Sequence, residues 1–202
     1  DLNVTRMASE AFYLHGSDRS GGTPLIQSQQ AEIPGLNAQY QRNCIFRNCR
    51  VTDCGFNAFN NNDAGENTWI VNCFADNVGN FCESAGYMLK IIGCYARNGA
   101  AVTLVPPPRT DLPASAREGK TVEIPSQAVI MGNVFEGGSF LGGMLVSGNE
   151  AVIADNVFTG YSKETAVILS GNNLIFKGNI VDLTKEPGTP DNTREGIEIK
   201  GN

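Results

Sequence analysis

The stretch AVIMGNVF at residues 128–135 returns as AVIADNVF at residues 151–158 and as LIFKGNIV at residues 174–181. Three earlier stretches have the same pattern: CIFRNCRV at 44–51, TWIVNCFA at 68–75 and LKIIGCYA at 89–96. Apolar residues alternate with other residues within each stretch, which is typical of a β-strand with one face turned inward. A repeat of about 23 residues without helical periodicity predicts a solenoid, each coil of which contributes three short strands.

One position of the repeat predicts a ladder along this solenoid. It holds Cys in the first three stretches and Asn in the last three: Cys49, Cys73, Cys94, Asn133, Asn156 and Asn179. The residue three positions earlier is always Phe or Ile, and a glycine precedes the ladder position by eight residues in four coils. Stacked coils lie about 4.8 Å apart, so a side chain repeated at a bend can hydrogen-bond to its neighbours. We therefore expect these six residues to stack in one column.

With these columns the chain resembles the pectin-lyase-like superfamily of right-handed parallel β-helices, which includes pectate lyases, polygalacturonases, alginate lyases and epimerases, and phage tailspikes. The resemblance covers residues 1–202 and implies an all-β fold, a right-handed parallel β-helix forming one segment. Gly16 and Gly201 continue the glycine column. Their positions predict that both chain ends fall inside a coil, with the first coil's ladder residue before residue 1, so that the chain is a fragment.

Composition and charge narrow the classes of partner. The formal net charge is −6 and no long basic run is present, which argues against nucleic acid. No stretch approaches the roughly 20 apolar residues of a membrane-spanning helix, so we expect no membrane insertion. Six cysteines are present, and the spacing of five between Cys44, Cys49 and Cys54 matches no common zinc pattern. We expect buried, reduced thiols, folded in a cytosol, in a protein that ends up in a virion or is secreted.

Two insertions interrupt the tight turns of the solenoid, at residues 17–43 and 105–126. Long loops on one edge of a rigid scaffold form groove walls and concentrate functional residues. We expect them to contribute the substrate-binding residues Asp18, Arg19 and Arg109. The alternative is that these loops cover an apolar flank or contact a neighbouring subunit.

The strand before the glycine column supplies the candidate catalytic residues. Its outward positions are expected to carry Tyr13 and His15, and to align Asn62, a further substrate-binding candidate, with Glu83. Asp63 interrupts an inward column that is apolar in later coils. Two carboxylates one coil apart, Asp63 and Glu83, suit the hydrolysis of a glycosidic bond. The alternative is that residues 56–66 form an irregular, solvated loop.

A second chemistry uses different residues of the same region. Tyr13 and His15 beside Asp18 and Arg19 suit proton abstraction next to a uronate carboxylate, which leads to β-elimination or epimerisation. For His15 the alternative is a surface residue at a strand end. No metal site is expected from the residues, and calcium is the cofactor that a lyase or epimerase of this kind would use.

Two rows of outward positions are unexpectedly apolar, which is typical of an interface. One runs from Ile45 through Trp69 to Ile175, and the other from Arg50 through Phe74 to Ile180. Tailspikes resemble this arrangement, with three β-helices side by side, so we expect a homotrimer. The leading hypothesis is a tailspike-like depolymerase that binds and hydrolyses a surface polysaccharide. The alternatives are a bacterial uronan lyase or C5-epimerase, and a non-catalytic stalk or adhesin.

Overall fold

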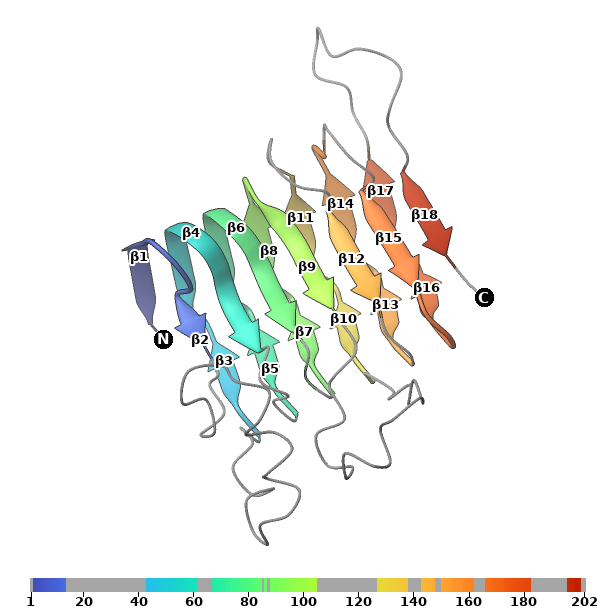
Figure 1. Cartoon of the computed structure of the whole chain (residues 1–202), viewed down its shortest axis with the longest axis horizontal. Coiled ribbons are helices and arrows are strands. Elements are labelled where there is room, and N and C mark those ends of the chain that lie inside the picture. The colour runs from blue at the N-terminus through green and yellow to red at the C-terminus, as the bar shows by residue number, and fades with distance from the viewer. Residues whose placement is uncertain are drawn as a thin grey trace, which may run out of the picture.

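The computed structural model describes residues 2–13, 43–61, 67–84, 86, 88–104, 127–137, 143–147, 150–161, 166–182 and 196–200. Over these residues the chain contains strands and turns but no helix. Every strand pairing among these residues is parallel, and partner residues in neighbouring coils lie 20 to 47 positions apart in sequence. The strands form an elongated stack that runs from β1 at one end to β18 at the other (Figure 1). The protein is therefore all-β with curled parallel sheets, an arrangement that fits a β-solenoid.

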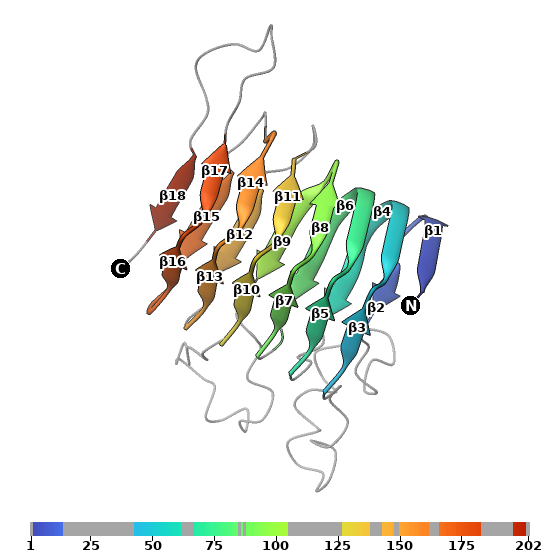
Figure 2. The same cartoon turned by 180° about the vertical axis from the view of Figure 1, so that it is seen from behind.

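The strands that precede the ladder form a six-stranded sheet, which faces the viewer in Figure 2. Its members in chain order are β3 (Ile45–Arg47), β5 (Trp69–Val71), β7 (Lys90–Ile92), β10 (Val129–Met131), β13 (Val152–Ala154) and β16 (Ile175–Lys177). Each strand is three residues long because a left-handed turn residue stands shortly before and after it.

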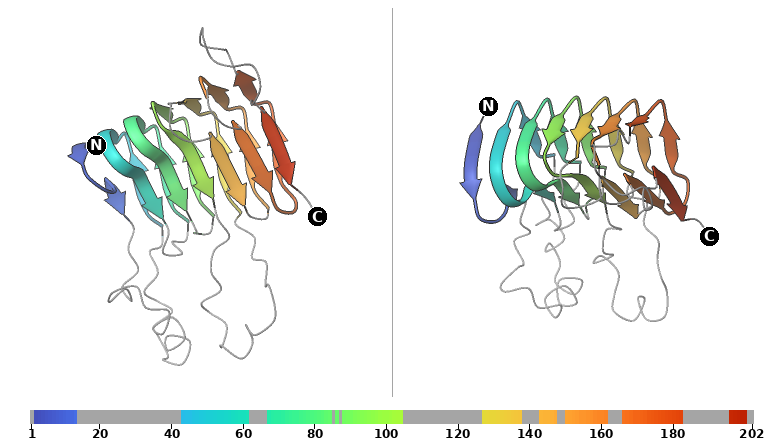
Figure 3. Two further views of the ribbon diagram at one scale, coloured as in Figure 1. Left: turned by 45° about the horizontal axis from the view of Figure 1, so that its top comes forward. Right: turned by 90° about the horizontal axis from the view of Figure 1, so that it is seen from above.

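The remaining strands form a twelve-stranded sheet made of two rows. The first row, directly after the ladder, comprises β1 (Asn3–Met7), β4 (Arg50–Asn61), β6 (Phe74–Ser84), β8 (Tyr95–Arg97), β11 (Val134–Glu136), β14 (Val157–Thr159) and β17 (Ile180–Asp182). The second row comprises β2 (Phe12–Tyr13), the ends of β4 and β6, β9 (Ala100–Leu104), β12 (Met144–Ser147), β15 (Val167–Ser170) and β18 (Ile197–Lys200). The two rows count as one sheet because β4 and β6 run continuously around the corner between them (Figure 3).

Most corners in the described part of the chain contain a residue in the left-handed conformation. One such residue stands immediately before the ladder position, as at Asn48 and Gly93. Another stands six residues before it, as at Asn67, and a third four residues after it, as at Asp53 and Asn77. Asn, Asp and Gly tolerate positive φ better than other residues, which explains their abundance in this sequence.

The predicted ladder is confirmed. The Cys49 backbone N–H donates to Cys73 Sγ at 3.4 Å, and the Asn133 N–H donates to Asn156 Oδ1 at 3.0 Å. The junction between the two halves is continuous, because the Cys94 N–H donates to Asn133 Oδ1 at 2.8 Å. The ladder position of the first coil is different from the prediction: Leu2 occupies it, since the Arg50 N–H donates to the Leu2 carbonyl oxygen.

The inward columns fill the interior with apolar side chains. Ile70, Ile91, Ile130 and Ile153 are stacked in one column and are at most 1 % exposed. The Phe135 ring packs against Phe81 on one side and Phe158 on the other, with ring centroids 5.8 and 5.5 Å away. Burying such side chains contributes roughly 1.5–3 kcal/mol each, so the interior column is the main source of stability.

The cysteines are free thiols. Burial raises the pKa of Cys49, Cys54 and Cys82, so these thiols are protonated at neutral pH. No helix among the described residues is long and apolar enough to cross a membrane.

Candidate functional site

A surface pocket of about 1030 Å³ lies at the corner where β4 and β6 bend. Its wall is built by Met7 at the end of β1, residues 53–57 of β4, residues 77–80 and 83 of β6, the turn at 98–99 and Thr103 of β9. It spans four neighbouring coils and opens to solvent, because the Phe56 ring in its wall is 53 % exposed. We call this feature the corner pocket.

Glycines allow the coils to approach closely at this corner. A Cβ atom on Gly55 would lie 2.6 Å from the Ala8 carbonyl oxygen, and one on Gly99 would lie 2.1 Å from the Val78 carbonyl oxygen. Real Cβ atoms do not come so close to backbone oxygen, so these positions accept only glycine without movement of the chain. β4 also contains an irregularity between Cys54 and Asn57, where its register against β6 shifts. Such bulges re-aim side chains near functional sites.

Glu83 is the predicted catalytic residue that the structure places in the corner pocket. Its Oε2 accepts a hydrogen bond of 2.8 Å from Asn57 Nδ2 on the preceding coil. Asn57 is 1 % exposed, so it holds one carboxylate oxygen from a fixed position. The side chain is half-buried, which leaves the other oxygen available to a ligand.

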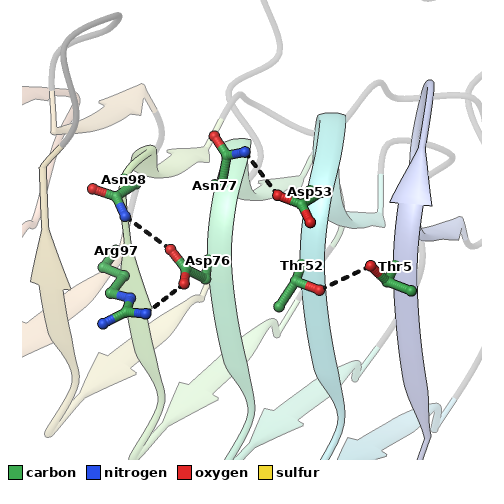
Figure 4. Close-up of polar contacts among 7 residues, drawn as sticks. All are labelled: Thr5, Thr52, Asp53, Asp76, Asn77, Arg97 and Asn98. Carbon is green, nitrogen blue, oxygen red and sulfur yellow. Dashed lines mark hydrogen bonds and ion pairs between the residues drawn. The ribbon is translucent and has the colours of Figure 1, made fainter.

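A second carboxylate in the pocket was not anticipated from the sequence. Asp53 lines the same wall and accepts a hydrogen bond of 2.9 Å from Asn77 Nδ2 (Figure 4). The signal was present, since Asp53, Asn77 and Asn98 all stand four residues after a ladder cysteine. It was missed because these residues belong to a turn, whose outward direction does not follow the period-two alternation of a strand.

The outer face beside the pocket carries a row of polar contacts between neighbouring coils. Asp76 accepts hydrogen bonds from Arg97 Nη2 at 2.6 Å and Asn98 Nδ2 at 2.8 Å (Figure 4). The hydrogen bond from Arg97 lowers the pKa of Asp76, with Asn98 adding to the effect. Further toward the N-terminal end, Thr52 donates to Thr5 (Figure 4).

The predicted alignment of the second coil is wrong by two residues. Glu83 is paired with Asn60, where Asn62 was expected. Val146 is paired with Leu104, Leu104 with Ser84, and Ser84 with Asn61. Asn61 therefore holds the inward position at which Asp63 was expected. The error arose because Gly65 was aligned with Gly86, a step of 21 residues, whereas the strands pair at a step of 23.

Of the other predicted site residues, Tyr13 is described and the rest are not. Tyr13 is 37 % exposed and is paired with Asn60, so it stands in the same row as Glu83, two coils away. Six further residues for which a role was predicted lie outside the described residues, as do the loops that carry the last three: Asn62, Asp63, His15, Asp18, Arg19 and Arg109.

The register of the expected apolar rows is confirmed. Ile45, Trp69 and Lys90 are in register, followed by Val129, Val152 and Ile175. Ile45 and Ile175 at the ends are 59 % and 50 % exposed, whereas Trp69, Val129 and Val152 are half-buried within this chain. Lys90 Nζ lies 4.1 Å from the Trp69 ring centroid, in a cation–π contact.

Metal binding has no support in the described part of the chain, which contains no group of three or more His, Cys, Asp or Glu side chains arranged to hold an ion. Comparison of the chain with protein-family models, with curated proteins and with solved structures found no match.

Proposed function

We propose that this chain is a segment of a right-handed parallel β-helix that binds a polysaccharide in the corner pocket and hydrolyses its glycosidic bonds. The observation that carries the proposal is the presence of two carboxylates, Asp53 and Glu83, in the wall of one pocket. Glycosidases cleave their substrates with a pair of carboxyl groups that flank the scissile bond. The coil that supplies Asp53 precedes the coil that supplies Glu83, so a sugar chain lying along the solenoid axis would pass both.

The surroundings of the two carboxylates suit a carbohydrate. Amide and hydroxyl groups of Asn57, Asn80 and Thr103 stand beside Glu83, and the exposed Phe56 ring provides an apolar surface. A few fixed polar groups on a largely apolar wall are typical of ligand sites. Glu83, which Asn57 holds in place, is the proposed proton donor, and Asp53 is the proposed base or nucleophile.

The charges of the pocket favour a neutral sugar over a uronate. Two carboxylates in one wall repel an anionic substrate at short range. A lyase or epimerase would instead need a cation near the uronate carboxylate. The observation that favours a lyase or epimerase as the second candidate is the position of Tyr13. It stands in the same row as Glu83, where its hydroxyl group could act as a base.

We further propose a tailspike-like assembly, which the apolar rows support. An apolar strip that follows the length of the six-stranded sheet suits packing against a neighbouring copy of the chain. We propose a homotrimer in which Trp69, Val129 and Val152 are covered by a neighbouring chain. A stable monomer in light scattering would contradict the trimer and leave the pocket chemistry untouched.

The test of hydrolysis is Glu83→Gln, which keeps the shape of the side chain and removes the carboxyl group that can give or take a proton. If Glu83 is the proton donor, turnover of a cleaved glycan should fall at least ~100-fold, the lower range for general acid–base residues. Asp53→Asn should have an effect of similar size. New reducing ends, measured over a panel of neutral polysaccharides, provide the readout.

Glu136→Gln is the matched control, because Glu136 is a half-buried glutamate of β11 outside the pocket. Its turnover should equal that of the wild type. Full activity in the Asp53→Asn, Glu83→Gln double variant would contradict the proposed site. Products with an unsaturated end would show that the reaction is β-elimination and not hydrolysis.

A further inference from the structure

The amide of Asn80 has an unused hydrogen-bonding atom at the wall of the corner pocket. Asn80 is 8 % exposed, and its Nδ2 donates to Thr103 Oγ1 at 3.0 Å. Its Oδ1 is buried and has no hydrogen-bond partner. An unpaired buried acceptor costs about 1–3 kcal/mol, so it persists only where something compensates for it.

The neighbouring groups of Asn80 are arranged in a regular way. Asn57 donates to Glu83 of the next coil, and Asn80, one coil further, donates to Thr103 of the coil after that. Asn57 is paired with Asn80, and Glu83 with Thr103, so the four side chains form two adjacent steps of one pattern. The first step holds a carboxylate, whereas the second holds a hydroxyl group whose proton remains free to donate.

Together these groups offer a ligand an acceptor and a donor side by side. The acceptor is Asn80 Oδ1 and the donor is the Thr103 hydroxyl. The terminal torsion of an Asn side chain is broad, so the oxygen can turn toward the pocket and exchange the hydrogen bond from Nδ2 to Thr103 for one to the ligand. If the amide turned over completely, its NH₂ group would be the free one, and the site would still present donor and acceptor character.

We infer that this corner of the pocket is a subsite for the acetamido group of an N-acetylated amino sugar. An acetamido group has an N–H for Asn80, a carbonyl oxygen for Thr103 and a methyl group for the apolar wall that Phe56 and Val78 provide. A sugar hydroxyl at the same place can also donate and accept, but its single oxygen carries no methyl group to fill the apolar wall. The inference rests on the proposed carbohydrate function, and it names the substrate class: neutral polysaccharides that contain N-acetylhexosamine.

The test is binding of the 202-residue chain to matched oligosaccharides that differ only in this group. The probes are N-acetylglucosamine and glucose oligomers of equal length and linkage, with corresponding pairs for galactose and mannose, followed by saturation-transfer NMR and titration. In at least one pair the N-acetylated member should bind at least ~10-fold more tightly, since the acetamido group adds a methyl contact and a second polar atom that the hydroxyl lacks. Asn80→Leu should abolish this preference.

A purely structural role for Asn80 predicts a different result. The Asn80→Leu variant would then unfold at a lower temperature and keep the preference, whereas our inference predicts lost preference with nearly unchanged thermal stability, because an unpaired acceptor is removed. Thr103→Val is the second variant and should weaken binding of the N-acetylated member. Thr52→Val is its matched control, because Thr52 makes the same kind of contact between coils outside the pocket.

The outcomes separate the two proposals. Binding of both members of every pair with equal affinity would overturn the acetamido inference and leave the carbohydrate function standing. A wild-type chain that binds none of the probes would overturn both. An Asn80→Leu variant that folds and retains the full preference would also overturn the inference.

Discussion

The coils before residue 104 and those after residue 127 share one backbone pattern but differ in chemistry on both the inner and the outer side. The ladder is Cys49, Cys73 and Cys94 in the first group and Asn in the second. On the outer side, the row that holds Asn60, Glu83 and Thr103 continues as Leu145 and Ile168. The backbone therefore fixes the positions along the axis, while the side chains at these positions are free to change with function.

The ladder shows why such a change is tolerated inside. Asn156 Nδ2 donates to the Ile130 carbonyl oxygen at 3.0 Å, and its Oδ1 accepts from the Asn133 N–H. Cys73 makes the same two contacts with one atom: its thiol donates to the Phe46 carbonyl oxygen at 3.6 Å and accepts from the Cys49 N–H at 3.4 Å. The position requires one donor and one acceptor, and thiol contacts are weaker than those of an amide.

The largest effect should follow from removing an Asn side chain from the ladder. Asn156→Ala leaves the Asn133 N–H and the Ile130 carbonyl oxygen without the Asn156 side chain, while Asn179 Oδ1 keeps the Asn156 backbone N–H as a donor. At about 1 kcal/mol or more for each of these two groups, the free energy of unfolding should fall by at least ~2 kcal/mol. Cys73→Ala should cost less, about 1–2 kcal/mol. Denaturant unfolding of both variants measures the difference, and equal losses would show that the two halves of the ladder do not differ.

The next effect concerns the close approach of the coils at the pocket. Gly99→Ala places a Cβ atom against the Val78 carbonyl oxygen, so the corner must open. We expect a loss of roughly 1–3 kcal/mol, as for other overpacked sites. Gly132→Ala is the control at a later coil, where nothing lies within 4 Å of the added atom and only the positive φ opposes the change. If Gly99→Ala unfolds at the same denaturant concentration as Gly132→Ala, close packing at this corner is not the reason for glycine.

A smaller effect is expected when a Cys of the ladder is replaced by Asn. Cys73→Asn offers a better donor and acceptor at a position that already supports both contacts. The change in the free energy of unfolding should remain within about 1 kcal/mol of zero, the range of volume-conserving core replacements. A loss as large as that of Asn156→Ala would mean that the spacing of the early coils admits only sulfur.

The smallest effect belongs to the outer polar row. Because Arg97 lowers the pKa of Asp76, the ionised carboxylate stabilises the folded chain at pH above the usual carboxyl range. This contribution is lost as the pH falls through the lowered pKa. Asp76→Asn should remove this part of the acid dependence, and at high salt the variant and the wild type should converge, since exposed charges are screened. A difference that persists in 1 M salt would argue for a role beyond the ion pair.

The sequence by itself determined the coil, the ladder and the inward columns. These features repeat with a fixed offset, and any residue that must stack on its equivalent in the next coil leaves a periodic signal, as Cys49, Cys73 and Asn133 do. Glu83 was also found in this way, because it stands on a strand whose outward positions alternate regularly.

Only the tertiary structure decided the register of the second coil and the composition of the pocket. The bulge in β4 and the residues inserted after Asn61 shift the pairing, so that Asn60 rather than Asn62 meets Glu83. Asp53 joins the pocket because its left-handed turn bends the chain around the corner, a direction set by local backbone geometry. The free acceptor of Asn80 depends on which neighbours reach it from adjacent coils. Periodicity predicts which residues stack, whereas the contacts at a bend follow from distances that exist only in the folded chain.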